Sequence, residues 1–175
     1  MVLWLIGLSG SGKSVLSQKI YSQLKKQYPS TVLLDGDEVR EVFGNDLGHT
    51  VEDRWRNAER ITRLCRLLNR QGIHVVCAVL SIFHESQRWN RENLQDYFEV
   101  YIETPFEQLL ERDSKGLYGA ALNGEVSNVV GVDIEFPRPV QPDVTLQNDG
   151  SLEDFLANGE KIIQLLPGLP RKLDF

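Results

Sequence analysis

Hydrophobic residues along this chain alternate between short continuous runs and longer segments in which they recur every three or four positions. The continuous runs predict strands at about 2–6, 31–34, 73–80, 98–102 and 143–147. The periodic segments predict helices at about 13–27, 51–71, 86–95, 104–111 and 152–166. Runs such as HVVCAVL, apolar on both faces of a strand, are typical of a parallel sheet covered by helices on both sides. The alternation therefore predicts a doubly wound α/β fold, in one domain over residues 1–175.

One connection is too long for an ordinary loop. Residues 114–140, SKGLYGAALNGEVSNVVGVDIEFPRPV, are weakly periodic, rich in glycine and end in prolines. Connections of this length within a compact domain are usually functional lids or disordered segments. We expect a lid over about residues 112–140.

Composition and charge narrow the class of protein. A chain of 175 residues with 41% hydrophobic content can bury one adequate core, and its net charge of −6 argues against a general nucleic-acid surface. The sequence has no apolar stretch near the ~20 residues of a membrane span and opens without a basic leader, so we expect a cytoplasmic protein. Cys65 and Cys77 lie in apolar surroundings without metal-ligand spacing, which predicts buried thiols. The sequence leaves the oligomeric state open, including a possible homodimer.

The segment GLSGSGKS, residues 7–14, has the full spacing G-x-x-x-x-G-K-S of a phosphate-binding loop. A plain glycine-rich turn is the alternative, but a strand precedes this segment and a helix follows it, as a phosphate-binding loop requires. Its glycines let backbone N–H groups turn inward around a polyphosphate, next to the positive end of the helix. We expect Lys13 to reach the β- and γ-phosphates of ATP and the Ser14 hydroxyl to hold Mg²⁺. The loop residues expected to bind the nucleotide are Gly7, Ser9, Gly10, Ser11, Gly12, Lys13 and Ser14.

Two aspartates follow the second predicted strand, in LLDGDEVR. Ligands of such sheets bind at the carboxyl ends of the strands, which places Asp35 and Asp37 beside the nucleotide. Asp37 could be only a helix N-cap, but we favour a catalytic carboxylate that orients the acceptor hydroxyl and accepts its proton. For Asp35 two interpretations stay open: a position near the metal or the loop, and a purely structural role.

The helix expected from about residue 51 has TVED at its start, which fits a capping box. Arg54 and Asn57 fall on its apolar side, in the first two turns. An arginine that points inward needs a partner. We favour an anionic acceptor in the cleft over the alternative, a carboxylate among Asp37, Asp46 and Asp53.

Together these motifs resemble the adenylylsulfate (APS) kinase family. The matching stretches run in the family's order across about residues 3–147: GLSGSGKS, LDGDEVR, DLG followed by EDRWRNAERI, LSIF, VYIETPFEQLLERDSKGLY and GVDIEFPRPVQPDVTL. The resemblance implies a P-loop NTPase-type fold and transfer of a phosphoryl group from MgATP to the 3′-hydroxyl of APS. It implies that Asp37 is the catalytic aspartate, that Arg40, Arg54 and Asn57 bind the acceptor, and that Arg112, Lys115 and the following segment form the lid. We also expect Arg112 to help hold the β- and γ-phosphates of ATP.

The chain departs from the family where the acceptor base binds. The family's LGFS is Leu47-Gly48-His49-Thr50 here and its FTG is Val129-Val130-Gly131, so both phenylalanines that sandwich adenine in the family are missing. Its SPYR becomes Ser81-Ile82-Phe83-His84. APS is the leading acceptor, and a smaller pyrimidine nucleotide such as cytidine diphosphoramidate is the alternative. The residues expected at the acceptor are Asp35, Arg40, His49, Arg54, Asn57, Ser81, Lys115, Val129 and Gly131.

A nucleotide-dependent switch module without kinase activity is a remote alternative. A small GTPase would need an N-K-x-D motif to read guanine, and the sequence contains none. We therefore expect a small-molecule kinase that uses ATP and Mg²⁺.

Overall fold

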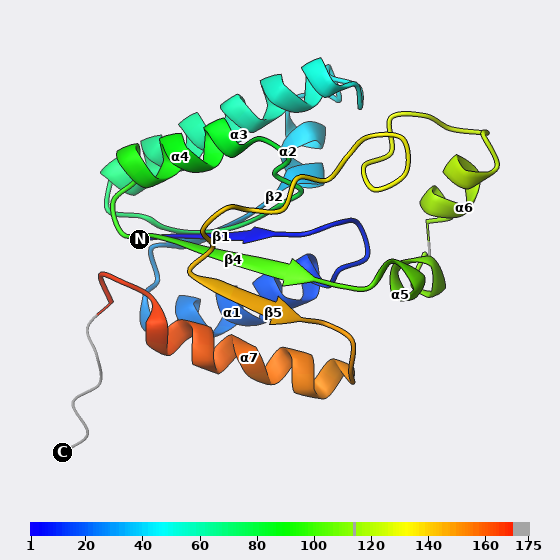
Figure 1. Cartoon of the computed structure of the whole chain (residues 1–175). Coiled ribbons are helices and arrows are strands. Elements are labelled where there is room, and N and C mark those ends of the chain that lie inside the picture. The colour runs from blue at the N-terminus through cyan, green and yellow to red at the C-terminus, as the bar shows by residue number, and fades with distance from the viewer. Residues whose placement is uncertain (114, 170–175) are drawn as a thin grey trace.

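The computed structural model describes residues 1–113 and 115–169, where five parallel strands form one sheet in the order β2-β3-β1-β4-β5. The strands are β1 (Val2–Ile6), β2 (Thr31–Asp35), β3 (His74–Val79), β4 (Tyr97–Glu103) and β5 (Val144–Gln147). The helices are α1 (Lys13–Gln27), α2 (Gly36–Val42), α3 (Val51–Arg70), α4 (His84–Asn93), α5 (Phe106–Glu111), α6 (Leu117–Leu122) and α7 (Leu152–Leu165). Helices α1 and α7 cover one face of the sheet and α3 and α4 cover the other (Figure 1). The predicted doubly wound α/β fold is confirmed.

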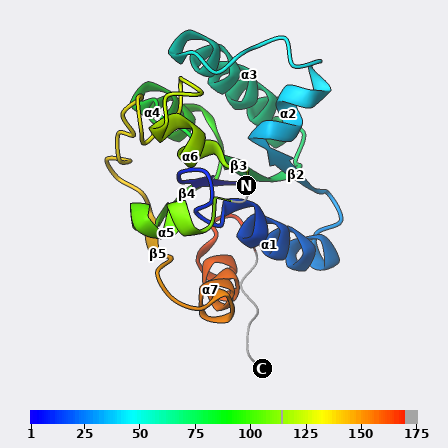
Figure 2. The same ribbon diagram turned by 90° about the vertical axis from the view of Figure 1, so that its right-hand side faces the viewer.

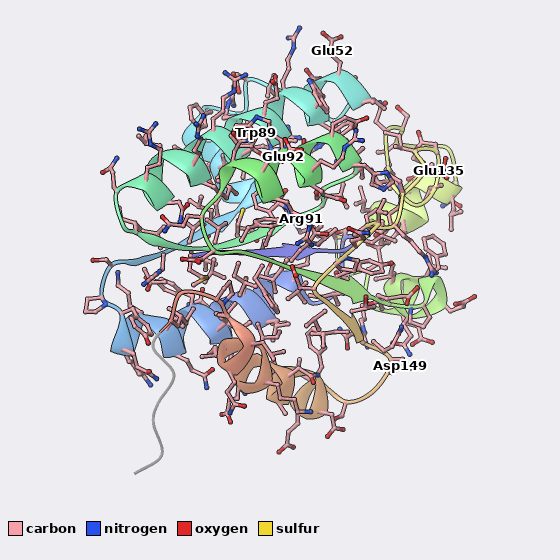
Figure 3. All side chains as sticks on the ribbon, turned by 60° about the vertical axis from the view of Figure 1, so that its left-hand side comes forward. Glu52, Trp89, Arg91, Glu92, Glu135 and Asp149 are labelled. Atoms are coloured by element: carbon pink, nitrogen blue, oxygen red, sulfur yellow. The ribbon has the colours of Figure 1, made fainter. Side chains whose placement is uncertain are left out.

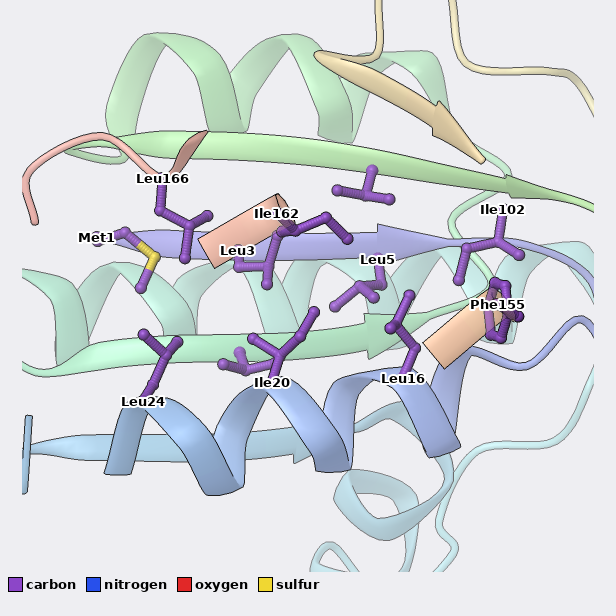
Figure 4. Packing of buried hydrophobic residues seen from close by; sticks show 12 residues of the cluster. Met1, Leu3, Leu5, Leu16, Ile20, Leu24, Ile102, Phe155, Ile162 and Leu166 are labelled. Carbon is purple, nitrogen blue, oxygen red and sulfur yellow. The ribbon is translucent and has the colours of Figure 1, made fainter. Parts of the chain in front are cut away.

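The central strand β1 is buried on both faces, which explains its unbroken hydrophobic run. Leu3 and Leu5 lie in the core cluster shared with α1 and α7 (Figure 4), whereas Trp4 lies in the cluster under α3. The second cluster also contains Cys65 and Cys77, both free thiols. Burial raises the pKa of the Cys77 thiol. The predicted buried thiols are confirmed.

Two short helices were not predicted from the sequence, and in each an aspartate side chain accepts N–H groups of the first turn. Helix α2 directly follows β2, and the Asp35 carboxylate caps it by accepting the backbone N–H of Asp37 at 2.9 Å. The N-cap of this helix is therefore Asp35, so the alternative that Asp37 serves only as the cap is wrong. Helix α6 lies inside the expected lid, where the Asp113 carboxylate accepts three N–H groups at 2.8–3.0 Å, from Leu117, Tyr118 and Gly119.

The segment that follows α5 extends beyond the carboxyl ends of the strands, and Figure 2 shows that edge of the sheet facing the viewer. Its return to β5 is anchored by Arg91 of α4 (Figure 3), whose guanidinium pairs with Asp143 at 3.1 Å. Ser114 of the expected lid and residues 170–175 of the expected domain lie outside the described residues. None of the helices that the structure describes is both long enough and apolar enough to cross a membrane.

Candidate active site

A cavity of about 1230 Å³ opens at the carboxyl edge of the sheet, between the glycine-rich loop, the end of β2, the start of α3 and the segment after α5. The structure brings most of the predicted site residues into its lining: Ser9, Gly10, Gly12, Lys13, Ser14, Asp35, Asp37, Arg40, His49, Arg54, Asn57, Ser81, Arg112, Lys115 and Val129. Three predicted residues lie outside this lining: Gly7, Ser11 and Gly131.

The glycine-rich loop forms a cradle at the start of α1. Gly10 and Gly12 have φ angles of 76° and 97°, in the left-handed region that favours glycine. A Cβ at Gly12 would lie 2.8 Å from both Asn148 and Phe155, so this position requires glycine for space as well. The cradle therefore depends on a bare backbone in front of the helix N-terminus, which is an anion-binding arrangement.

Gly7 and Ser11 support the cradle from behind. A Cβ at Gly7 would lie 2.5 Å from Ser11 Oγ and 2.8 Å from the carbonyl oxygen of Ile102. Ser11 is fully buried, and its carbonyl oxygen accepts a hydrogen bond from the Asn148 amide at 2.9 Å. These two residues thus shape the loop, and their side-chain positions do not face the cavity.

Lys13 curls over the loop and donates from Nζ to the carbonyl oxygen of Leu8 at 2.7 Å. Burial lowers its pKa from 10.5 to about 8, although Asp35 and Asp37 act in the opposite direction. A lysine whose charge is this poorly solvated gains from an anionic partner in the cavity.

Ser14 and Asp35 meet beside the cradle. The Ser14 hydroxyl donates to the Asp35 carboxylate at 2.9 Å, and the other oxygen of that carboxylate caps α2. The described ranges 1–113 and 115–169 contain no cluster of three His, Cys, Asp or Glu side chains that could hold a metal ion alone. One hydroxyl and one carboxylate at a phosphate cradle do fit Mg²⁺, because that ion keeps waters and takes most of its other ligands from bound phosphates.

Asp37 lies in the first turn of α2, where Asp35 and not Asp37 is the cap. Its side chain is 76% exposed, and its Oδ2 lies 3.3 Å from Nζ of Lys115. This ion pair links the end of β2 to the segment after α5 across the mouth of the cavity.

Two arginines gather at the other end of the cavity with backbone carbonyls as their hydrogen-bond partners. Arg40 donates to the carbonyl oxygens of Leu47 and Gly48 at 3.2 and 2.8 Å. Arg54 donates to those of His49 and Asn128 at 2.8 and 2.7 Å. Burial lowers the pKa of both guanidinium groups, and for Arg54 the nearby charge of Arg40 adds to the effect.

The carboxylate partners considered for Arg54 are engaged elsewhere. Asp46 accepts both guanidinium nitrogens of Arg60 at 2.9 and 2.8 Å, and Asp53 accepts the hydroxyl of Thr50. In the part of the chain that the structure describes, neither Arg40 nor Arg54 forms an ion pair. The guanidinium groups of Arg40 and Arg54 thus line the cavity without an ion pair to a carboxylate, which suits an anionic ligand.

Three further polar residues, Asn57, Ser81 and His49, line the same cavity. Asn57 is only 6% exposed, and its Oδ1 has no hydrogen-bond partner among the described residues. Ser81 follows β3 with a φ of 50°, an uncommon angle for a residue other than glycine. Burial, followed by the charges of Arg40 and Arg54, lowers the pKa of His49 and so favours its neutral imidazole.

Several lining residues were missed by the sequence analysis, notably Asn148, Leu152 and Phe83. Asn148 directly follows β5, so the same strand-end rule that singled out Asp35 would have found it. Phe83 packs edge-to-face on Trp55 with ring centroids 5.0 Å apart. No spacing in the sequence distinguishes it from a core aromatic residue.

Comparisons with known proteins agree with this arrangement. The sequence model of the family described as adenylylsulphate kinase matches residues 1–147. The chain belongs to the adenylylsulphate kinase family. As a member of it, the protein is an ATP-using P-loop kinase, a phosphotransferase with a hydroxyl group as acceptor.

Individual proteins with similar sequences or structures match most of the length of this chain. It is 43% identical over 150 residues to the cytidine diphosphoramidate kinase of Campylobacter jejuni, covering 84% of this chain and 85% of the relative. It is 41% identical over 152 residues to the adenylyl-sulfate kinase of Myxococcus xanthus, covering 85% and 82%. The solved structure of the Mycobacterium tuberculosis APS kinase CysC in complex with AMPPNP and APS has a TM-score of 0.83, 33% identity, and coverage of 94% and 95%.

Proposed function

We propose that this kinase transfers the γ-phosphoryl group of ATP to the ribose 3′-hydroxyl of a small nucleotide acceptor. The observation that carries the proposal is the composition of the single cavity described above. A phosphate cradle lies at one end, two arginines without counter-ions lie at the other, and Asp37 lies in the same lining.

The donor end is assigned to the triphosphate. Lys13 binds the β- and γ-phosphates, and Arg112, whose guanidinium also contacts the carbonyl oxygen of Asn148 at 3.4 Å, approaches them from α5. Ser14 and Asp35 would hold Mg²⁺ beside the phosphates, and the ion would supply positive charge that offsets the charge of the transferred group. Phosphoryl transfer needs little covalent chemistry from the protein, so these residues act by position and charge.

Asp37 is assigned to the acceptor hydroxyl. Its exposed carboxylate accepts the proton of the hydroxyl and orients that oxygen in line with the γ-phosphorus. The lid over about residues 112–140 brings Lys115 to the same place and excludes water that would otherwise hydrolyse ATP.

Arg40 and Arg54 are assigned to an anionic diphosphate-like group of the acceptor, and Asn57 and Ser81 to its other polar atoms. Both guanidinium groups retain N–H donors beyond those that contact backbone carbonyl oxygens. They can therefore bind the acceptor without giving up those contacts.

For the acceptor base we favour a pyrimidine, as in cytidine diphosphoramidate. Stacking on an aromatic side chain is worth about 1–3 kcal/mol per base. His49 and Val129 occupy the positions at which the resemblance places the two phenylalanines that sandwich adenine, so the stabilisation of an adenine base is reduced here. The Campylobacter jejuni relative, whose name specifies cytidine diphosphoramidate, supports the same choice. APS, which the sequence motifs favoured, is the second candidate, supported by the family match and the Myxococcus xanthus relative.

The test compares kcat/KM for cytidine diphosphoramidate and APS at saturating MgATP. Lys13→Ala serves as the impaired control, with turnover lower by about 10²-fold or more because a preorganised charge is lost, and Lys26→Ala on the exposed end of α1 as the matched neutral control. We expect the higher kcat/KM with cytidine diphosphoramidate. Efficient turnover of APS alone would reverse the order of the two acceptors, and turnover of neither by a protein that binds ATP would overturn the acceptor assignment.

A further inference from the structure

The lid loop that lines the acceptor end of the cavity is organised around one carboxylate. Asp133 accepts the backbone N–H groups of Asn128 and Val129, each at 2.6 Å, one on each carboxylate oxygen. These bonds keep the pKa of Asp133 below its usual value, so the group stays ionised. Asn128 itself has a φ of 64°, a left-handed conformation that needs such local support in a residue other than glycine.

The peptide between Asn128 and Val129 joins Asp133 to the acceptor site. Its N–H donates to Asp133, and its C=O, on the opposite side of the same planar unit, accepts from Arg54 at 2.7 Å. Arg54 in turn donates from Nε to the carbonyl oxygen of His49 at 2.8 Å. One rigid peptide plane therefore connects a lid carboxylate to the guanidinium that also holds the loop before α3.

We infer that Asp133 is a positioning residue for the acceptor: by orienting the 128–129 peptide, it aims Arg54 at the anionic group of the nucleotide. Asp133 lies outside the lining of the cavity, so it acts through Arg54 and not by direct contact with substrate. This inference rests on the proposed function only in assigning the acceptor to the Arg54 end. The alternative is that Asp133 merely keeps Val129, which is 3% exposed, packed against Leu109 and Tyr118.

The decisive variant is Asp133→Asn, which preserves size but removes the charge and replaces one acceptor oxygen by a donor. We expect the KM for the acceptor to rise about tenfold, because one backbone N–H loses its partner and Arg54 loses its orientation. The KM for ATP and kcat should change by less than about threefold, since the cradle and Asp37 are untouched. Glu135→Gln is the matched control, an exposed carboxylate on the same loop (Figure 3), and should leave all three constants unchanged.

A double-mutant cycle separates positioning from packing. If Asp133 acts through Arg54, Asp133→Asn should have less than about a twofold effect on acceptor KM in an Arg54→Ala background. Independent effects of the two substitutions would overturn the inference, as would an unchanged acceptor KM in Asp133→Asn. If Asp133→Asn fails to fold, Asp133→Glu is the second variant, because it retains the charge but shifts the carboxylate. In that variant, faster exchange of the loop amides together with an unchanged acceptor KM would also contradict the positioning role.

Hydrogen exchange makes the result independent of turnover. Amides of residues 126–134 should exchange faster in both Asp133→Asn and Arg54→Ala than in the parent protein, with no change in Glu135→Gln. If the parent protein phosphorylated neither nucleotide, the proposed acceptor would be wrong. Unchanged exchange in Arg54→Ala would show, separately, that the 128–129 peptide is not coupled to Arg54.

Discussion

At the scale of single residues, the site contains basic side chains whose charged form is destabilised by burial, so that an anionic ligand would stabilise it. Lys13 is the clearest case, because burial holds its pKa at about 8 while its ordinary value is 10.5. A bound polyphosphate restores the preference for the ammonium form. We therefore expect nucleotide binding and proton binding to be linked at this one side chain.

We expect ATP binding above pH 8 to take up protons. At pH 9 a lysine with a pKa of about 8 is mostly neutral in the free protein and mostly charged beside phosphate, so ATP binding should take up a proton at this side chain. ATP affinity should then fall as pH rises from about 8 toward 10.5. Calorimetry at pH 9 in two buffers of different ionisation enthalpy measures the uptake, and Lys13→Met should abolish it; equal uptake in both proteins would contradict the assignment.

The lowered pKa of Lys13 also makes the free energy of unfolding depend on pH, in the opposite direction from that expected for a salt-bridged lysine. Because the folded-state pKa lies below the unfolded value, the unfolded chain binds more protons between about pH 8 and 10.5. The contribution of Lys13 to the free energy of unfolding therefore rises with pH across this window, and its unfavourable effect is complete below pH 8.

Substitutions of Asp37 and of Arg54 should change different kinetic constants. Asp37→Asn should lower kcat by about 10²–10⁴-fold, because an amide cannot accept the proton of the hydroxyl, whereas Arg54→Ala should mainly raise acceptor KM. Steady-state kinetics with both substrates varied measures this split, with Glu38→Gln, at an exposed position on α2, as the control. Loss of ATP binding in Arg54→Ala, measured by calorimetry without acceptor, would place the arginine in the structure of the donor site instead.

At the scale of elements, the short helices α2 and α6 complete the site. With seven and six residues, they are too short to show a hydrophobic period, and each depends on a carboxylate at its start. Helix α6 also reaches the cradle, since the hydroxyl of Tyr118 donates to the carbonyl oxygen of Ser9 at 2.9 Å. The stability of α6 is thereby coupled to the glycine-rich loop.

Asp113→Ala should loosen α6 without unfolding the domain. Three N–H groups lose their acceptor, and the loss of such a cap costs about 0.5–2 kcal/mol. Amides of residues 117–122 should exchange faster, and KM for ATP should rise because Tyr118 no longer supports the loop. Glu111→Ala, at the exposed end of α5, is the control, and an unchanged exchange rate in Asp113→Ala would contradict the capping role.

At the scale of the whole molecule, stability depends on the layers that cover β1. Leu5 is fully buried among Leu16, Ile20 and Phe155, between the sheet and the helices α1 and α7 (Figure 4). Removing side-chain atoms from such a position loses transfer free energy and leaves a cavity. The cavity opens at the carboxyl ends of the same strands, so its geometry depends on this core.

Leu5→Ala should lower the free energy of unfolding by about 2–5 kcal/mol, as large-to-small changes in packed cores do. Urea denaturation measures the change, and Leu165→Ala, at a side chain 57% exposed on α7, should stay within about 0.5 kcal/mol of the parent protein. A loss below about 1 kcal/mol for Leu5→Ala would mean that the core relaxes into the space.

The sequence by itself determined the class of fold and the donor loop, because both are encoded locally. Continuous apolar strands alternating with periodic helices permit few topologies, and residues 7–14 carry the cradle in their own spacing. The thiols at Cys65 and Cys77 were predicted for the same reason.

Only the tertiary structure decided which groups at the site lack partners. It assigned the helix cap to Asp35 and left Asp37 exposed, paired Asp46 with Arg60 rather than Arg54, and placed Gly131 away from the cavity. It also joined Asn128 to Arg54 across 74 positions of the chain. Such contacts form between segments that are distant in the sequence and come together only in the folded protein. Local periodicity and residue spacing therefore cannot predict them.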